Sequence, residues 1–287
     1  GIACSATAVV MVPFSASTGS WVVLLFNFFM MGVCGAALVS FTVAAACWSF
    51  PGKEAGPVMA LCNSAFGMTS AVLPGLLRPV RGNAFAEYAV VALCATPALA
   101  LLLASHPPSR PLDGPSPAAS SEEESSRWSV VLAAAAAKFL LVGTNSSLLG
   151  WIVFFSDTEL GQAELAPAFV SLLQGCLMLG SLASSKYQQY FPLWDLARVQ
   201  VLAAALGSSL WLPFLSSTNA AVLAIAWFGL VGGPVMSYCE VLLNQMCAPK
   251  GIQLALISAG GNFGNSAGPF FVGLLMTRFG PQALPVW

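Results

Sequence analysis

The chain has 287 residues, of which 57% are hydrophobic and only 7% are charged. Soluble domains carry about 25% charged residues, so this composition excludes an ordinary water-soluble globule and predicts a multi-pass integral membrane protein that is surrounded by a lipid bilayer. The net charge of −1 also excludes the basic surface that binding to a nucleic acid requires.

A bilayer core about 30 Å thick needs roughly 20 apolar residues of helix. Such runs predict an all-α membrane protein with about nine complete transmembrane helices and the start of a tenth near Leu284. The predicted spans are 2–15, 20–50, 55–80, 87–105, 128–156, 164–184, 199–215, 219–246 and 252–276. The short alternating segments of a membrane β-barrel do not occur in the sequence.

One connection differs from the short polar loops between the spans. Residues 106–127 hold five prolines, a serine-rich stretch and the acidic run Glu122-Glu123-Glu124. Such a segment cannot bury enough apolar surface to fold, so we predict a disordered central linker. The linker separates residues 1–105, with four spans, from residues 128–287, with five spans and the start of another.

The parts on either side of the linker carry a weak internal repeat at one ungapped offset. The matched pairs are Gly32 with Gly229, Gly35 with Gly232, Ser40 with Ser237, Lys53 with Lys250, Phe66 with Phe263 and Gly67 with Gly264. At this offset the partners of residues 128–184 would precede Gly1. We therefore expect a fragment of two parallel six-helix halves, containing spans 3–6, then spans 7–11 and the start of span 12.

Basic residues orient the predicted spans. In the six-plus-six arrangement, the side of the central linker carries Lys53, Arg110, Arg127, Lys186, Arg198 and Lys250, whereas the other side carries Arg78, Arg81 and Arg278. Loops rich in lysine and arginine usually face the cytoplasm. The linker is therefore predicted to be cytoplasmic, and the sequence does not specify which membrane holds the protein.

Rows of small residues spaced four apart predict close helix contacts, because such residues stack on one helix face. The rows are Gly32 with Ala36 and Ser40, Gly67 with Ala71 and Gly75, Gly229 with Gly233 and Ser237, and Gly260 with Gly264 and Gly268. Pro74, Pro234 and Pro269 each remove a backbone hydrogen bond inside a predicted span. Two interpretations stay open, namely static packing and helices that slide or rock during transport.

Polar residues inside the spans predict a substrate or ion pathway, because they are costly in lipid. Lys138 and Glu240 have opposite charges at overlapping depths, so they are expected to pair, unless each reaches the cytoplasmic interface instead. Asn145 shares a helix face with Lys138, and Asn244 shares one with Glu240. Further amides at membrane depth are Asn27, Asn63, Gln174, Asn262 and Asn265.

Residues usually found in metal or cofactor sites are scattered. The chain has eight cysteines and one histidine, His106, with no Cys-x-x-Cys pair. The sequence therefore predicts no metal site and no cofactor. An enzyme would also need a nucleophile–base pair, and we find no convincing one, so enzymatic activity is not expected.

The stretch from Gly52 to Leu61, continuing through Phe66-Gly67 to Leu73-Pro74, resembles the loop and fifth span of major facilitator superfamily transporters. It is most similar to the branch with sodium-dependent glucose transporter-like proteins and fucose permease. Members of that branch often have a histidine after the leucine, where this chain has Cys62.

The resemblance implies a monomeric secondary transporter that works by alternating access, with a cavity lined by the first, fourth, seventh and tenth spans. The expected cargo is a small polar solute such as a sugar, and its transport is either coupled to Na⁺ or H⁺ or facilitative. The alternative function is that of a transporter-like receptor or structural protein that moves no solute.

Overall fold

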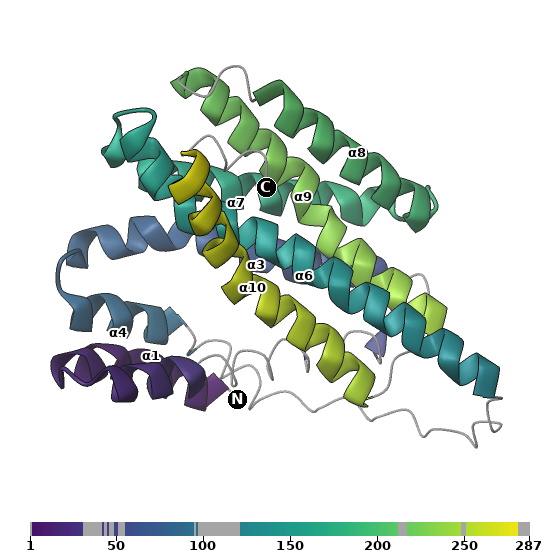
Figure 1. Ribbon diagram of the computed structural model, residues 1–287, viewed down its shortest axis with the longest axis horizontal. Coiled ribbons are helices and arrows are strands. Elements are labelled where there is room, and N and C mark those ends of the chain that lie inside the picture. The colour runs from purple at the N-terminus through teal and green to yellow at the C-terminus, as the bar shows by residue number, and fades with distance from the viewer. Residues whose placement is uncertain are drawn as a thin grey trace. The chain divides into compact units, whose positions relative to one another are not determined.

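Every regular element in the described part of the chain is helical. The structure is a computed structural model, and it describes residues 2–30, 42, 45, 49–50, 55–94, 96, 121–211, 217–247 and 251–280. In chain order the helices are α1 (Ile2–Ser17), α3 (Ala55–Leu77), α4 (Ala84–Cys94), α6 (Ser121–Thr158), α7 (Ala166–Tyr187), α8 (Leu193–Trp211), α9 (Thr218–Cys247) and α10 (Gly251–Phe279) (Figure 1). Short 3-10 helices cover Arg78–Val80 (η2) and Ala163–Leu165 (η3). The predicted all-α class is confirmed for these residues, none of which forms a strand.

Four described stretches are long and apolar enough to cross a membrane. They are Gly56–Val80, Trp128–Thr158, Ala163–Tyr187 and Thr218–Cys239, and they fall on the predicted spans 55–80, 128–156, 164–184 and 219–246. Their length follows from uninterrupted apolar sequence, since a helix of about 20 residues matches the bilayer core. A membrane-crossing character is therefore supported for these four helices, and the larger count remains a prediction.

The last described helix, α10, is long but less apolar than the four. It extends over 29 residues and covers the predicted span 252–276. Its middle part, residues 260–269, contains glycines, two asparagines and a proline, which lower its mean hydropathy. Gly260, Gly264 and Gly268 of this part lie against α6, so its glycines serve a helix–helix contact.

Helix α6 begins earlier than the predicted span. It starts at Ser121, inside the segment 106–127 that is predicted to be a disordered linker. Acidic residues are typical of the first turn of a helix, because carboxylates favour the positive end of the helix dipole. Residues 106–120 of the predicted linker lie outside the described part of the chain.

The chain divides into two compact units. The first comprises residues 1–49 and 72–112, and the second comprises residues 50–71 and 113–287. Within the first unit α1 packs on α4, and the rings of Phe14 and Phe85 meet edge to face at 4.8 Å. Helix α4 begins at a cap in which the Asn83 side-chain oxygen accepts the Ala86 N–H at 3.2 Å.

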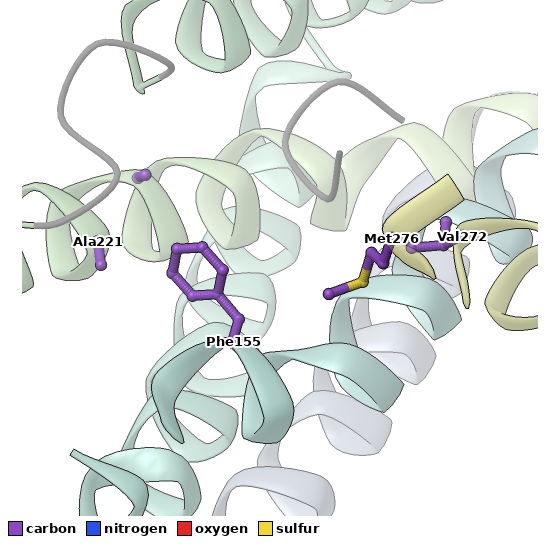
Figure 2. Packing of buried hydrophobic residues seen from close by; sticks show 5 residues of the cluster. Phe155, Ala221, Val272 and Met276 are labelled. Atoms are coloured by element: carbon purple, nitrogen blue, oxygen red, sulfur yellow. The ribbon is translucent and has the colours of Figure 1, made fainter. Parts of the chain in front are cut away.

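The second unit is built around α6, α7, α9 and α10. Helix α6 packs along α10, and α7 packs along α9, which also contacts α8. Phe155 of α6 belongs to a buried apolar cluster with Ala221 of α9 and with Val272 and Met276 of α10. Figure 2 shows the Phe155 ring with Ala221 on one side and Met276 on the other. This apolar cluster holds α6, α9 and α10 together near one end of α6.

Candidate functional site

Glycines spaced four apart on α10 lie against the backbone of α6. The facing pairs are Gly260 with Ala135, Gly264 with Phe139, and Gly268 with Gly143. A Cβ atom added at Gly260 or Gly268 would lie 2.5 Å from the facing carbonyl oxygen, closer than real Cβ atoms approach. Only glycine therefore permits this contact. We call these six residues the α6–α10 interface. The residue numbers of the facing pairs rise in steps of four on both helices, so the two helices run in the same direction.

Polar groups beside the α6–α10 interface pair with each other. The Trp151 indole Nε1 donates a hydrogen bond to the Pro269 carbonyl oxygen at 2.8 Å, and the Ser146 hydroxyl donates one to Asn265 Oδ1. Pro269 has no N–H and leaves the backbone carbonyl of Asn265 without its usual helical donor. Side chains of α6 thus bind α10 where its own backbone ladder is interrupted.

The predicted pathway residues of α6 lie next to this interface. Lys138 is half-buried, and a Cβ atom added at Gly261 would lie 3.2 Å from its Cγ. The methylene stem of Lys138 therefore covers a glycine of α10, which is a common arrangement for long basic side chains. Asn145 is also half-buried on α6, whereas Asn262 and Asn265 of α10 are exposed.

A second glycine-mediated contact joins α3, α7 and α9. A Cβ atom added at Gly67 of α3 would lie 3.0 Å from the Gln174 carbonyl oxygen, and Gly67 also faces the Met178 backbone. On α9, a Cβ atom added at Gly229 would lie 2.5 Å from the Leu173 carbonyl oxygen. We define the α3–α7–α9 interface as Asn63, Ser64 and Gly67 of α3, Gln174, Met178 and Ser181 of α7, and Gly229, Gly233 and Ser237 of α9.

Amides and hydroxyls occupy this second interface. The Asn63 side-chain nitrogen donates to the Ser237 hydroxyl at 2.8 Å, and Ser237 is completely buried. The Ser64 hydroxyl donates to the Ala60 carbonyl of its own helix at 2.7 Å and lies 3.4 Å from the Met178 carbonyl oxygen. The predicted residue Asn63 is thereby joined to α9 by one direct hydrogen bond.

Helix α7 carries buried oxygens that have no hydrogen-bond partner within the described residues. The described residues contain four such oxygens. Three of them belong to α7 and the turn after it, namely Gln174 Oε1, Ser181 Oγ and Gln188 Oε1. Gln174 is 1% exposed and Ser181 is fully buried. The three residues are spaced by seven, and so they lie along one line of the helix.

Four polar residues near this line were not among the predicted site residues, namely Ser181, Ser184, Gln188 and Tyr238. The hydroxyls of Ser184 and Tyr238 are hydrogen-bonded to each other, and the Gln188 amide nitrogen donates to Ser184 Oγ at 3.3 Å. The seven-residue spacing of Gln174, Ser181 and Gln188 is a signal that could have found this line. It is weak by itself, because serine is common in membrane helices.

Other predicted residues fall elsewhere. Asn27 is buried in the first unit, as part of an apolar helix over Trp21–Met30. Pro74 of α3 is half-buried and belongs to the same unit. Gly32 lies outside the described residues. The backbones of Glu240 and Asn244 belong to α9, but their side chains are not among those that the structure describes. The pairing of Lys138 with Glu240 therefore stays a prediction.

The chemistry that the second interface offers is hydrogen bonding by neutral groups. Its described polar side chains are asparagine, glutamine and serine, with Tyr238 next to them. Among the residues that the structure describes, no three His, Cys, Asp or Glu side chains lie together as a metal site would require. Comparisons with protein-family models and with curated proteins each give no match to this chain.

Proposed function

We propose that the protein is a membrane transporter that moves a small polar solute by alternating access. The observation that carries the proposal is the α3–α7–α9 interface. It buries neutral amides and hydroxyls between three helices that are each long and apolar enough to cross a membrane. Polar side chains at membrane depth are costly, and a protein retains them there mainly where a solute, an ion or another helix uses them.

Glycine contacts support movement as well as packing. At the α3–α7–α9 interface the backbones touch through glycine, so few side chains interlock across the contact. Without a hydrophobic force between helices in lipid, such contacts depend on van der Waals packing and hydrogen bonds. A helix held in this way parts from its neighbour with little repacking, as alternating access requires.

The architecture that we propose is that of the major facilitator superfamily, with two six-helix halves and a cytoplasmic linker. Its support is the resemblance of residues 52–74, whose described part forms most of α3 and supplies Asn63 and Gly67. We further propose that the transporter is monomeric, that it catalyses no covalent chemistry, and that Lys138, Glu240, Asn145 and Asn244 couple transport to Na⁺ or H⁺.

Uptake by the reconstituted protein tests this function. Proteoliposomes would be prepared without a gradient, with a sodium gradient or with a proton gradient across the membrane. Their uptake of labelled hexoses would be compared with that of vesicles that lack the protein. We expect saturable uptake. Asn63→Leu should reduce it several-fold, whereas Asn219→Leu, at an exposed position of α9, should not change it.

Two negative outcomes have different meanings. A folded protein that moves another neutral or charged solute, but no hexose, would contradict the sugar assignment alone. A folded protein that moves no solute under any gradient would contradict transport and would favour the receptor or structural role.

A further inference from the structure

The segment that joins α7 to α8 carries a cluster of exposed aromatic side chains. They are Tyr187, Tyr190, Phe191 and Trp194, and each of them is more than half exposed. Exposed tyrosine and tryptophan are typical of the membrane–water interface, because their rings are apolar at one end and polar at the other. We call residues 186–198 the α7–α8 connection.

The place of this connection in the chain fits the edge of a bilayer core. The apolar stretch Ala163–Tyr187 has 25 residues, which extend about 37 Å as a helix, whereas the bilayer core is about 30 Å thick. A helix of this length that crosses the core reaches the headgroup layer at its end. Beyond the connection, α8 presents the exposed aliphatic side chains of Val199, Leu202 and Leu206. The aromatic cluster thus separates two apolar surfaces, as residues at headgroup level do.

Basic side chains flank the aromatic cluster. Lys186 is exposed at the end of α7, and the guanidinium carbon of Arg198 lies 5.1 Å from the centre of the Trp194 ring. Arg198 Nη1 also lies 3.9 Å from Asp195 Oδ1, in a pair whose side chains are both exposed. Such a pair is weak, and a guanidinium has five N–H donors. Arg198 therefore retains donors for an anion such as a phosphate.

The connection at the other end of α7 has the opposite character. Residues 157–165 include Asp157, Glu159 and Glu164, but no lysine, arginine, tryptophan or tyrosine. In residues 186–198, by contrast, two basic residues and one acidic residue give a net charge of +1. An anionic headgroup is therefore favoured at one end of α7 only. That end is on the side predicted to be cytoplasmic, and the cytoplasmic leaflet is the one rich in anionic lipids.

We propose that the α7–α8 connection binds an anionic phospholipid. Arg198 binds the phosphate group, since the planar guanidinium matches two of its oxygens. Lys186 adds positive potential, and the exposed rings contact the region between the headgroup and the acyl chains. This inference goes beyond the proposed function. It needs α7 to cross the membrane, but it holds whether or not the protein moves a solute.

A photoreactive lipid locates the site on the unaltered protein. The protein would be reconstituted in phosphatidylcholine vesicles that contain a small fraction of phosphatidylglycerol with a diazirine on its headgroup. After illumination, mass spectrometry would identify the crosslinked peptides. We expect the crosslinks to concentrate in residues 186–198. We also expect a yield at least about five-fold lower when the diazirine is on phosphatidylcholine, because that headgroup has no net charge.

Removal of one charge tests the role of Arg198. In Arg198→Gln, we expect about five-fold less crosslinking of residues 186–198 by the phosphatidylglycerol probe. The matched control is Arg278→Gln. Arg278 is also exposed, and its guanidinium carbon lies 5.4 Å from the centre of the Phe279 ring, but residues 274–282 contain neither tyrosine nor tryptophan. The control should change this crosslinking by less than about two-fold.

The outcomes separate clearly. Crosslinks that concentrate in residues 186–198 and depend on Arg198 support the lipid site. Crosslinks spread evenly over all helix ends would overturn it, and so would equal yields from the two lipids. Equal losses in the two variants would also overturn it, since overall charge would then explain the binding. If Arg198→Gln does not fold, crosslinking of the unaltered protein still decides. Normal crosslinking without solute uptake would contradict transport alone.

Discussion

The two interfaces of the second unit share one kind of backbone contact and differ in how their polar groups are satisfied. At the α6–α10 interface, Trp151 binds the Pro269 carbonyl and Ser146 binds Asn265. At the α3–α7–α9 interface, Asn63 binds Ser237, but Gln174 Oε1 and Ser181 Oγ have no hydrogen-bond partner among the described residues. Glycine brings helices together in both places, and hydrogen bonding distinguishes a fixed contact from a separable one.

This difference matters in a membrane because lipid supplies no hydrophobic force that would hold two apolar helices together. Two helices whose polar groups bind each other lose those bonds when they separate. Helices whose polar groups do not bind each other lose less. We therefore expect α6 and α10 to move as one body, and α3 to be the helix that moves against α7 and α9.

Covalent locking of each interface is expected to give the largest effect. In a background without native cysteines, Ser64→Cys with Met178→Cys joins α3 to α7, and Ser146→Cys with Asn265→Cys joins α6 to α10. Oxidation of the first pair should reduce solute uptake about ten-fold or more, because the moving helix is held. Oxidation of the second pair should change uptake by less than about two-fold relative to the reduced protein, since those helices already move together.

Reduction of the disulfide must restore uptake in the first case, which controls for damage to the protein. Equal inhibition by both crosslinks would show that the two interfaces do not differ in mobility.

Enlargement of a glycine at the fixed interface should destabilise the fold. An added methyl group at Gly264 meets the Phe139 backbone carbonyl, which cannot rotate away. We expect Gly264→Ala to lower the free energy of unfolding by about 2 kcal/mol. At the neighbouring Gly261 the nearest atoms are those of the flexible Lys138 side chain, 3.2 Å away, so Gly261→Ala should change stability by less than about 0.5 kcal/mol. Denaturant titration in mixed micelles measures both variants, and similar losses would contradict the backbone contact.

Removal of the indole donor tests the polar part of the same interface. Trp151→Phe keeps most of the ring and deletes the bond to the Pro269 carbonyl, so the unfolding free energy should fall by about 1 kcal/mol. Trp194→Phe, at a position 52% exposed, is the control and should change it by less than about 0.5 kcal/mol. If Trp151→Phe also has no effect, the bond does not contribute to holding α6 and α10 together.

The sequence predicts helices well here and predicts their partners poorly. The helical class and the four long apolar stretches follow from composition and run length. The row Gly260, Gly264 and Gly268 is visible as a spacing of four, but its partner row on α6 begins at Ala135, in a run of alanines that looks the same on every face. Which helix a glycine row meets depends on the tertiary arrangement, and so spacing alone does not give it.

The polar residues show the same limit. Gln174 is recognisable as an amide in an apolar run, whereas Ser181 is not, because serine often satisfies itself on its own helix. Only the fold shows that Ser181 lacks such a bond and faces Gly233. The early start of α6 at Ser121 was hidden for a different reason, since acidic and serine residues are typical both of linkers and of helix starts.

The smallest effect should come from the one direct hydrogen bond of the separable interface. Unfolding free energies of Asn63→Ala, Ser237→Ala and the double variant give the coupling between the two side chains, which we expect to be about 0.6 kcal/mol. The coupling is small because Ser237, once its partner is removed, can donate to the backbone carbonyl four residues earlier in α9. A coupling above about 1.7 kcal/mol would exceed the usual range for such bonds in membranes. It would mean that α3 is fixed to α9, so that the α3–α7–α9 interface would no longer differ from the α6–α10 interface.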